Sequence, residues 1–105
     1  MFGIFKKLFA PADNTPLREA IKEGAFLVDV RTPAEFSAGS VKGAINIPLD
    51  QVAGQLAKFR NKKNIVVFCR SGGRSGQAKS ILERNGFQHI INGGSWTQVK
   101  QIAEH

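Results

Sequence analysis

One short stretch constrains the fold of this chain more than any other: an apolar run that ends in a cysteine and a glycine-rich loop. Residues 65–68, Ile-Val-Val-Phe, are continuously β-branched and aromatic, which predicts a strand buried on both faces. Cys69 follows at once, and two glycines and two arginines come next. After Ser75, apolar residues recur at helical spacing. The stretch therefore predicts a strand, a thiol, a tight loop and a helix in succession.

The loop after this strand has the composition of an anion-binding cradle around a nucleophile. Gly72 and Gly73 let the backbone curl without Cβ clashes, so that several N–H groups can point to one place at the start of a helix. Arg70 and Arg74 add positive charge. A thiol in such surroundings should ionise more readily than a free cysteine, because they favour the thiolate. A cysteine that only fills space in a core needs none of these neighbours, and we predict that Cys69 is a nucleophile.

Three segments of the chain resemble the rhodanese family of sulfurtransferases, in the family's order. Residues 69–75, Cys-Arg-Ser-Gly-Gly-Arg-Ser, resemble its active-site loop. The other two segments are an upstream one, residues 27–31, 35–36 and 39–48, and a closing one, residues 92–94 with Trp96. The match spans about Thr15 to Trp96. One position departs from the family pattern: Ser40 stands where the family usually has histidine, and we expect a local structural change there without loss of activity.

The order of apolar segments predicts an α/β fold. Strands alternate with helices of about ten residues, which indicates βαβ units, a parallel sheet and right-handed crossovers. The resemblance implies a three-layer rhodanese-like fold with helices on both faces of the sheet. Four strands are evident, and the resemblance implies a fifth near residues 9–14, where no strand pattern is visible. The four evident strands are expected at residues 25–30, 44–47, 65–68 and 87–91.

Capping residues predict where the helices start and end. Helix starts are expected at Thr15, at Thr32 in a capping box with Glu35, at Asp50 and at Ser95. The helix from Asp50 is expected to continue through Phe59, because apolar residues recur in it at helical spacing. Glycines are expected to end three helices and to turn the chain after the last strand: Gly24, Gly39, Gly86 and the pair at 93–94.

Length and composition suit one domain. We expect residues 15–105 to form it, with residues 1–14 a basic, apolar segment and linker. For this segment a weak membrane contact is one alternative, and packing on the domain or fraying is the other. No run approaches the roughly 18 apolar residues of a membrane span.

A single cysteine excludes an internal disulfide and a multi-cysteine metal site, and a lone reactive thiol suits the reducing cytoplasm. We expect a monomer with no metal and no cofactor.

The net charge of +7 lies entirely in residues 51–105. It can raise the local concentration of anionic substrates. The basic run at residues 58–63 has a structural explanation, because cations complement the dipole at the end of a helix. The sequence shows neither aromatic residues interleaved with basic ones nor a recognised nucleic-acid motif, so we predict no binding of nucleic acid.

The residues alone predict nucleophilic chemistry by Cys69 on an anionic or electron-poor substrate. The resemblance narrows this to sulfane-sulfur transfer, from thiosulfate or a similar small anionic donor, through a Cys69 persulfide, to cyanide, a thiol or an acceptor protein. The loop would bind the donor and the persulfide through Arg70, Ser71, Gly72, Gly73, Arg74 and Ser75. Asp29 and Arg31 are expected to hold the loop and the helix after it. Trp96 is expected either to wall the pocket or to pack in the core.

Two other classes of function remain open. The first is a cysteine-based phosphatase or arsenate reductase of the same fold. Four residues separate Cys69 from Arg74 where the phosphatase pattern has five, and the smaller cradle suits a sulfur atom better than a tetrahedral phosphate. No acid that could protonate a leaving group is evident. The second is a non-catalytic interaction domain, and inactive relatives of that kind commonly lack the cysteine that is present here.

Overall fold

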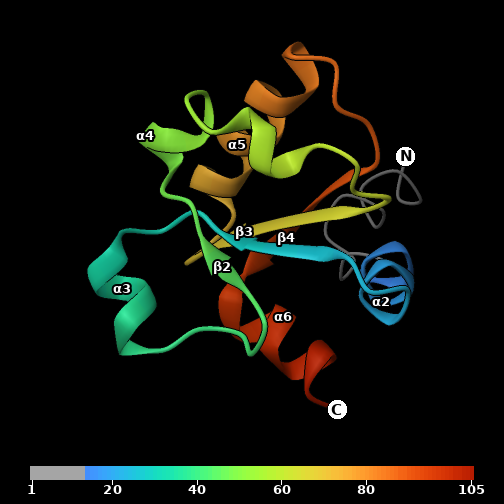
Figure 1. Cartoon of the computed structure of the whole chain (residues 1–105). Helices are drawn as coiled ribbons and strands as arrows, with labels where there is room; N and C mark the ends of the chain where they lie inside the picture. Colours follow the sequence, from blue (N-terminus) through green and yellow to red (C-terminus); the bar gives the residue numbers. More distant parts are fainter. Residues whose placement is uncertain (1–13) are drawn as a thin grey trace, which may run out of the picture.

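A parallel sheet of four strands runs through the molecule (Figure 1). The computed structural model describes residues 14–105, so the segment at 1–14 and the fifth strand expected near 9–14 lie almost wholly outside the described residues. The strands are β1 (Phe26–Asp29), β2 (Ile45–Asn46), β3 (Ile65–Cys69) and β4 (Ile90–Ser95), in the spatial order β2-β1-β3-β4. Every neighbouring pair is parallel, as the alternation of strands and helices predicts.

Helices cover both faces of this sheet, which completes the expected three layers (Figure 1). Helices α2 (Thr15–Lys22) and α6 (Trp96–Ala103) pack on one face. On the other face lie α4 (Leu49–Val52), the 3₁₀ turn η1 (Leu56–Phe59) and α5 (Gly73–Arg84). Helix α3 (Pro33–Ala38) connects β1 to β2. None of the helices within residues 14–105 is long and apolar enough to cross a membrane.

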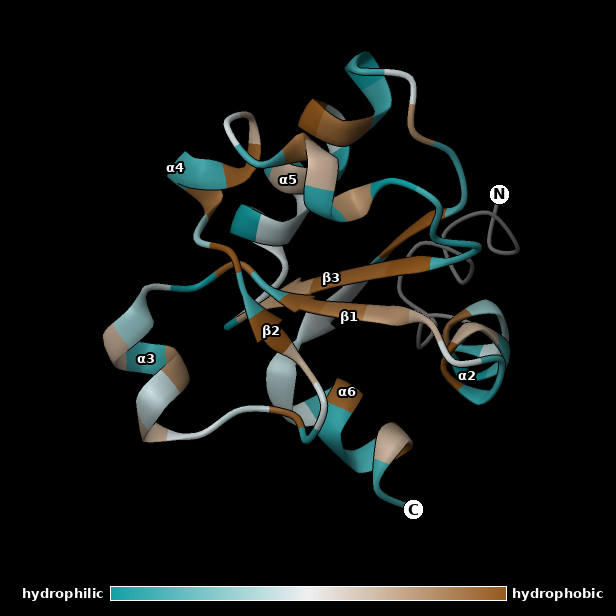
Figure 2. Ribbon diagram, in the orientation of Figure 1, coloured by the Kyte–Doolittle hydropathy of each residue, from teal (hydrophilic) through white to brown (hydrophobic). Residues whose placement is uncertain are grey.

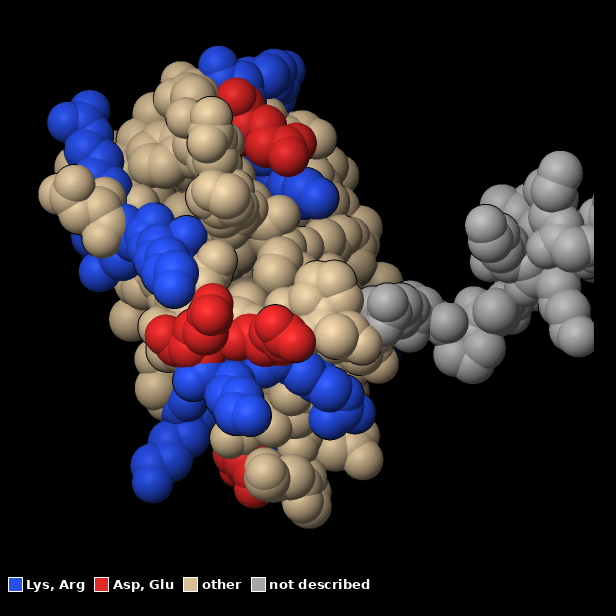
Figure 3. All heavy atoms as spheres, turned by 90° about the vertical axis from the view of Figure 1, so that its right-hand side faces the viewer, with Lys and Arg blue, Asp and Glu red and all other residues tan. Residues whose placement is uncertain are grey.

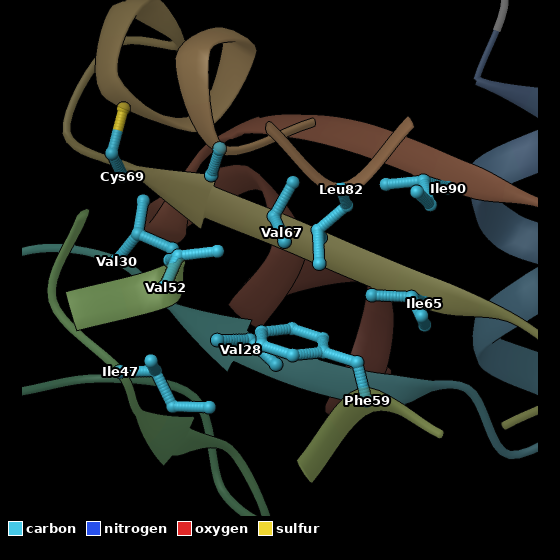
Figure 4. Close-up of a cluster of buried hydrophobic side chains, with 11 residues drawn as sticks. Val28, Val30, Ile47, Val52, Phe59, Ile65, Val67, Cys69, Leu82 and Ile90 are labelled. Atoms are coloured by element: carbon cyan, nitrogen blue, oxygen red, sulfur yellow. The ribbon is translucent and has the colours of Figure 1, made fainter. Parts of the chain in front are cut away.

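Strand β3 is buried on both faces, as its sequence predicts. Because side chains alternate along a strand, Ile65, Val67 and Cys69 join the cluster beneath α4 and α5, while Val66 and Phe68 join the cluster beneath α2 and α6. Hydrophobic residues accordingly concentrate on the strands in Figure 2. Figure 4 shows Cys69 at one end of the first cluster. Cys69 is therefore anchored by the core itself, on the strand that the rest of the fold surrounds.

Local capping signals hold for two of the four predicted helix starts. Thr32 and Glu35 form the expected capping box at α3, and the Ser95 hydroxyl accepts the backbone N–H of Gln98 at the start of α6. The prediction that Thr15 is an N-cap is wrong. Asn14 holds that position without a side-chain cap, and Thr15 lies inside the first turn.

The helix expected from Asp50 through Phe59 is also wrong. The chain forms two short helical segments, α4 and η1, and α4 begins at Leu49 after Pro48. Gly54 lies between the two segments, and glycine is a poor helix former. Both segments still place an apolar residue, Val52 and Phe59, in the same buried cluster.

The last strand is longer and later than the sequence pattern predicts. It runs over Ile90–Ser95 instead of 87–91, and the two glycines expected to turn the chain lie inside it. Val67 pairs with Asn92 and Phe68 with Gly94, so that Gly93 forms a bulge. A Cβ on Gly93 would lie 2.7 Å from Val99 Cγ2, so only glycine fits there. The bulge extends β4 as far as the loop that follows Cys69.

Figure 3 shows basic side chains at several separate places on one side of the molecule, with acidic side chains among them. Lys63 Nζ lies 3.7 Å from Glu23 Oε2, and both side chains are at least half exposed. Exposed pairs of this kind contribute little to stability. The positive charge on this side is thus dispersed.

Candidate active site

The loop that follows β3 curls around the sulfur of Cys69. Gly72 adopts a left-handed conformation with φ of 102°, which glycine accepts without strain, and it caps the start of α5. The turn directs the Gly72 N–H to Cys69 Sγ, at 3.0 Å. The hydroxyl of Ser75, in the first turn of α5, lies 3.4 Å from the same sulfur. Both side chains are buried, so backbone and hydroxyl groups from the loop meet the thiol inside the protein.

The surroundings of Cys69 favour its thiolate. Burial of the sulfur is the largest single influence and raises the pKa, but hydrogen bonds together outweigh it. They come from the Ser75 hydroxyl and from the backbone at Ser75, Ser71 and Gly72, and the net effect lowers the pKa of Cys69 from 9.0 to about 7. The direction agrees with the sequence-based prediction. The cause agrees in part, because the predicted loop N–H groups are among the leading influences and the arginines are not.

Arg74 is engaged with a residue from another helix. Its guanidinium binds both carboxylate oxygens of Glu35, from Nη1 to Oε1 at 2.7 Å and from Nη2 to Oε2 at 3.1 Å. The Arg74 hydrogen bond is the main cause that lowers the pKa of Glu35 from 4.5 to about 2, and Thr32 adds to it. The pair leaves about a third of each side chain exposed. The sequence predicts Glu35 only as a capping residue, since no local pattern points to a partner 39 positions away.

Arg70, in contrast, is exposed and makes no ion pair with any residue in the described part of the chain. It directly follows Cys69 in the sequence. Its charge is therefore available to a ligand that approaches the loop from solvent, whereas the charge of Arg74 is already balanced by Glu35.

Asn92 is a site residue that the sequence-based analysis includes only as part of the closing segment. Its Oδ1 lies 2.6 Å from the Ser75 hydroxyl and accepts the Gly94 N–H at 3.0 Å. Its Nδ2 donates to the Gly72 carbonyl at 3.1 Å. One amide side chain thus links β4 to the loop and to the first turn of α5. The bulge at Gly93 displaces the register at this point, and a bulge cannot be read from a pair of glycines alone.

Asp29 and Arg31 form a buried ion pair at the end of β1. Arg31 donates from Nη2 to Asp29 Oδ2 at 2.7 Å, and from the same nitrogen to the Gly39 carbonyl at 2.6 Å. The hydroxyl of Ser40 donates to Asp29 Oδ2 at 2.7 Å. The serine that replaces the family's usual histidine thus binds the buried carboxylate directly. These contacts hold the turn after α3, the helix that carries Glu35.

Trp96 packs in the core and beneath Arg31. The guanidinium carbon of Arg31 lies 4.8 Å from the centre of the indole ring, a cation–π contact. The indole is partly buried and packs against the cluster beneath α2 and α6. Of the two roles open to Trp96 from the sequence, core packing is the one that these contacts describe.

Comparison with known proteins identifies the family. A family model, the rhodanese-like domain, matches residues 13–101. The chain belongs to the rhodanese family. It is 44% identical over 78 residues to thiosulfate sulfurtransferase PspE of Escherichia coli, covering 72% of each chain. It is 35% identical over 81 residues to a sulfurtransferase of Allochromatium vinosum, covering 77% of this chain and 76% of the relative.

Solved structures of rhodaneses share the fold. A rhodanese from E. coli, determined with anions, has a TM-score of 0.65 at 39% identity and covers 71% of this chain and 91% of its own. A human single-domain sulfurtransferase has a TM-score of 0.64 at 30% identity, and the match covers 78% of this chain and 87% of the human one. The rhodanese fold, with its parallel sheet and flanking helices, is thereby confirmed, and so is the enzyme class: this rhodanese is a sulfurtransferase.

Proposed function

We propose that this sulfurtransferase takes sulfane sulfur from thiosulfate or a similar small anion, holds it as a Cys69 persulfide and passes it to cyanide, a thiol or an acceptor protein. The Cys69 thiolate attacks the outer sulfur of thiosulfate, a new S–S bond forms, and the original S–S bond breaks to release sulfite. An acceptor thiolate or cyanide then attacks the outer sulfur of the persulfide, and the Cys69 thiolate leaves. Two half-reactions through a covalent intermediate give ping-pong kinetics.

The observation that carries this proposal is the contact of Cys69 Sγ with the Gly72 N–H, at 3.0 Å, inside a glycine-rich loop at the start of a helix. Preorganised N–H groups stabilise negative charge on sulfur without reorganising during the reaction. A pKa near 7 keeps a large share of Cys69 as thiolate at neutral pH. The thiosulfate named for the E. coli relative supports the choice of donor.

The remaining loop residues take supporting roles in this proposal. Ser71, Gly72 and Gly73 shape the cradle, and Arg70 attracts the anionic donor from solvent. Arg74 braces the end of the loop through its pair with Glu35. Asp29, Arg31 and Trp96 act at a distance, by holding the turn after α3.

The domain boundary, the oligomeric state and the compartment are also proposals. We propose that residues 15–105 form the catalytic domain, that residues 1–14 are dispensable for sulfur transfer, and that the protein acts as a cytoplasmic monomer. A lone reactive thiol suits a reducing compartment. Deletion of residues 1–14 tests the domain boundary, with kcat/KM for thiosulfate expected to stay within about twofold of the full chain.

Intact-mass measurement after incubation with thiosulfate tests the reaction directly. We expect a gain of one sulfur atom on the full chain, removed by dithiothreitol. The matched control is Cys69→Ser, which keeps the size of the side chain and should gain no sulfur and transfer none to cyanide. A folded Cys69→Ser variant with native turnover, or a native protein that gains no sulfur, would overturn the proposal.

A further inference from the structure

The hydroxyl of Ser75 stands between two groups that can both use its single proton. Cys69 Sγ lies 3.4 Å from the oxygen on one side, and Asn92 Oδ1 lies 2.6 Å from it on the other. Ser75 is fully buried, so water does not supply a further partner. The direction of this one O–H bond decides what the hydroxyl offers to the sulfur.

Backbone partners determine the orientation of the Asn92 amide. Its Oδ1 meets the Gly94 N–H, which can only donate, and its Nδ2 meets the Gly72 carbonyl, which can only accept. Swapping the oxygen and the nitrogen would break both hydrogen bonds. Since Oδ1 carries no proton, the Ser75 hydroxyl must be the donor in its contact with Asn92.

This assignment leaves only oxygen lone pairs facing Cys69. In this orientation the hydroxyl can accept the S–H of the neutral thiol, and it stabilises the thiolate only once it turns to donate to the sulfur. When Cys69 loses its proton to solvent, Ser75 must turn away from Asn92 to donate to the sulfur. Asn92 and the thiolate therefore compete for the same proton.

We propose that Asn92 is a positioning residue for Cys69: it holds the proton of the Ser75 hydroxyl and so limits how strongly that hydroxyl stabilises the thiolate. The role deepens the proposed sulfur transfer and rests on Cys69 as its nucleophile. Asn92 acts through Ser75, at a junction that the bulge in β4 creates.

Charged groups near the thiol act independently of this competition. Arg74 on α5 interacts electrostatically with Cys69 and with Asp29. Glu35 on α3 balances Arg74, and Arg70 is next to the thiol in sequence. Strand β4, which carries Asn92, brings no titratable side chain, and the acidic residue of α4, Asp50, is exposed. None of these charges is altered by changing the amide to an uncharged side chain.

Replacing Asn92 removes its hydrogen bonds to the Gly72 carbonyl and from the Gly94 N–H, both at exposed positions that water can reach. Its side chain is exposed, so truncation leaves no buried cavity. The Gly72 carbonyl that it binds also accepts the Gly76 N–H at 2.9 Å and keeps that bond. Asn92→Ala removes the competitor for the proton, and Asn92→Leu does so while keeping the branched shape of the side chain.

Rates of iodoacetamide alkylation against pH, measured on the full chain, test the proposal. We expect Asn92→Ala and Asn92→Leu to lower the midpoint for Cys69 by about 0.5–1 pH unit, the equivalent of one hydrogen bond. In a Ser75→Ala background the same substitutions should leave the midpoint unchanged, since no proton remains to be shared. Asn92→Asp keeps an acceptor and adds negative charge, and it should raise the midpoint.

Two results would overturn the proposal. One is a midpoint that stays the same or rises in Asn92→Ala and Asn92→Leu. The other is an equal shift with and without Ser75, which would show that Asn92 acts only by holding the loop. Alkylation needs no sulfur donor, so the competition can fail while the mass gain from thiosulfate still occurs. Equally, the shift can occur in a protein that gains no sulfur, which would overturn the proposed function alone.

Discussion

The guanidinium of Arg74 is held by both carboxylate oxygens of Glu35, at 2.7 and 3.1 Å. The same carboxylate accepts the backbone N–H of Thr32 at 3.1 Å and so caps α3. One side chain thus joins the helix after β1 to the loop after β3. In this structure Arg74 serves the loop from outside, as a brace, while the N–H groups face the sulfur.

The pair predicts a pH dependence of stability. Because binding to Arg74 lowers the pKa of Glu35 from 4.5 to about 2, the ionised carboxylate stabilises the folded state. That contribution is complete above about pH 5 and is lost as the pH falls through 4.5 towards 2. Urea unfolding of the native protein and of Glu35→Gln should give a constant difference in unfolding free energy above pH 5. The difference should shrink below pH 4.5. A difference that persists unchanged at pH 2 would contradict the assignment.

The two loop arginines should differ in their kinetic effects. Arg70→Ala should raise KM for thiosulfate by about tenfold with a smaller change in kcat, since a charge that attracts the donor acts equally in the ground and transition states. Arg74→Ala should also lower kcat, because the loop loses its brace. Glu35→Gln is the matched control and should lower kcat in the same way, since it removes the same brace from the other side.

Ionic strength separates these roles further. For the native protein kcat/KM should fall as salt rises, and Arg70→Ala should weaken that dependence. Steady-state kinetics across a salt series measure both effects. Equal changes in kcat and KM for the two arginine variants would refute the different roles assigned to Arg70 and Arg74. So would a native kcat/KM that does not change with salt concentration.

Ser40 should matter for stability and not for chemistry. Its hydroxyl donates to the buried carboxylate of Asp29 at 2.7 Å, and a hydrogen bond to a charged group is worth about 1.5–3 kcal/mol. Ser40→Ala should lower the free energy of unfolding by about that amount, with kcat/KM unchanged. Ser37→Ala, on the exposed side of α3, is the control and should change the stability by less than about 0.5 kcal/mol. Full stability in Ser40→Ala would contradict the role assigned to this contact.

The length of the loop should select sulfur over phosphate. The native protein should turn over thiosulfate and hydrolyse p-nitrophenyl phosphate at a rate near background. A glycine inserted between Gly73 and Arg74 should lower sulfur transfer by at least about tenfold, because the N–H groups would no longer converge at the distance of a sulfur atom. If the native protein proves the better phosphatase, the choice between the two reaction classes made from loop length is wrong.

Local features of this protein follow from its sequence because they depend on neighbours along the chain. Three such features depend only on residues within a few positions of one another: the alternation of buried side chains along β3, the curl of the loop at Gly72 and the capping box at Thr32. The thiol and its cradle are such a feature, since the Gly72 N–H that meets Cys69 is three residues away. The βαβ order also predicts a parallel sheet, because a helix that crosses over between two strands lets the second strand run in the same direction as the first.

The partners of the loop were decided by the tertiary structure alone. Glu35 and Arg74 are 39 positions apart, and Ser75 and Asn92 are 17 apart. Each pair meets only because β1, β3 and β4 lie side by side and a bulge shifts the last of them. Hydrophobic periodicity determines which face of an element is buried, but it does not determine which polar side chains at the ends of different strands come within 3 Å of each other. That depends on strand order and register. Here they place the Asn92 amide from β4 and the Glu35 carboxylate from α3 beside the loop, and the sequence of the loop itself predicts neither partner.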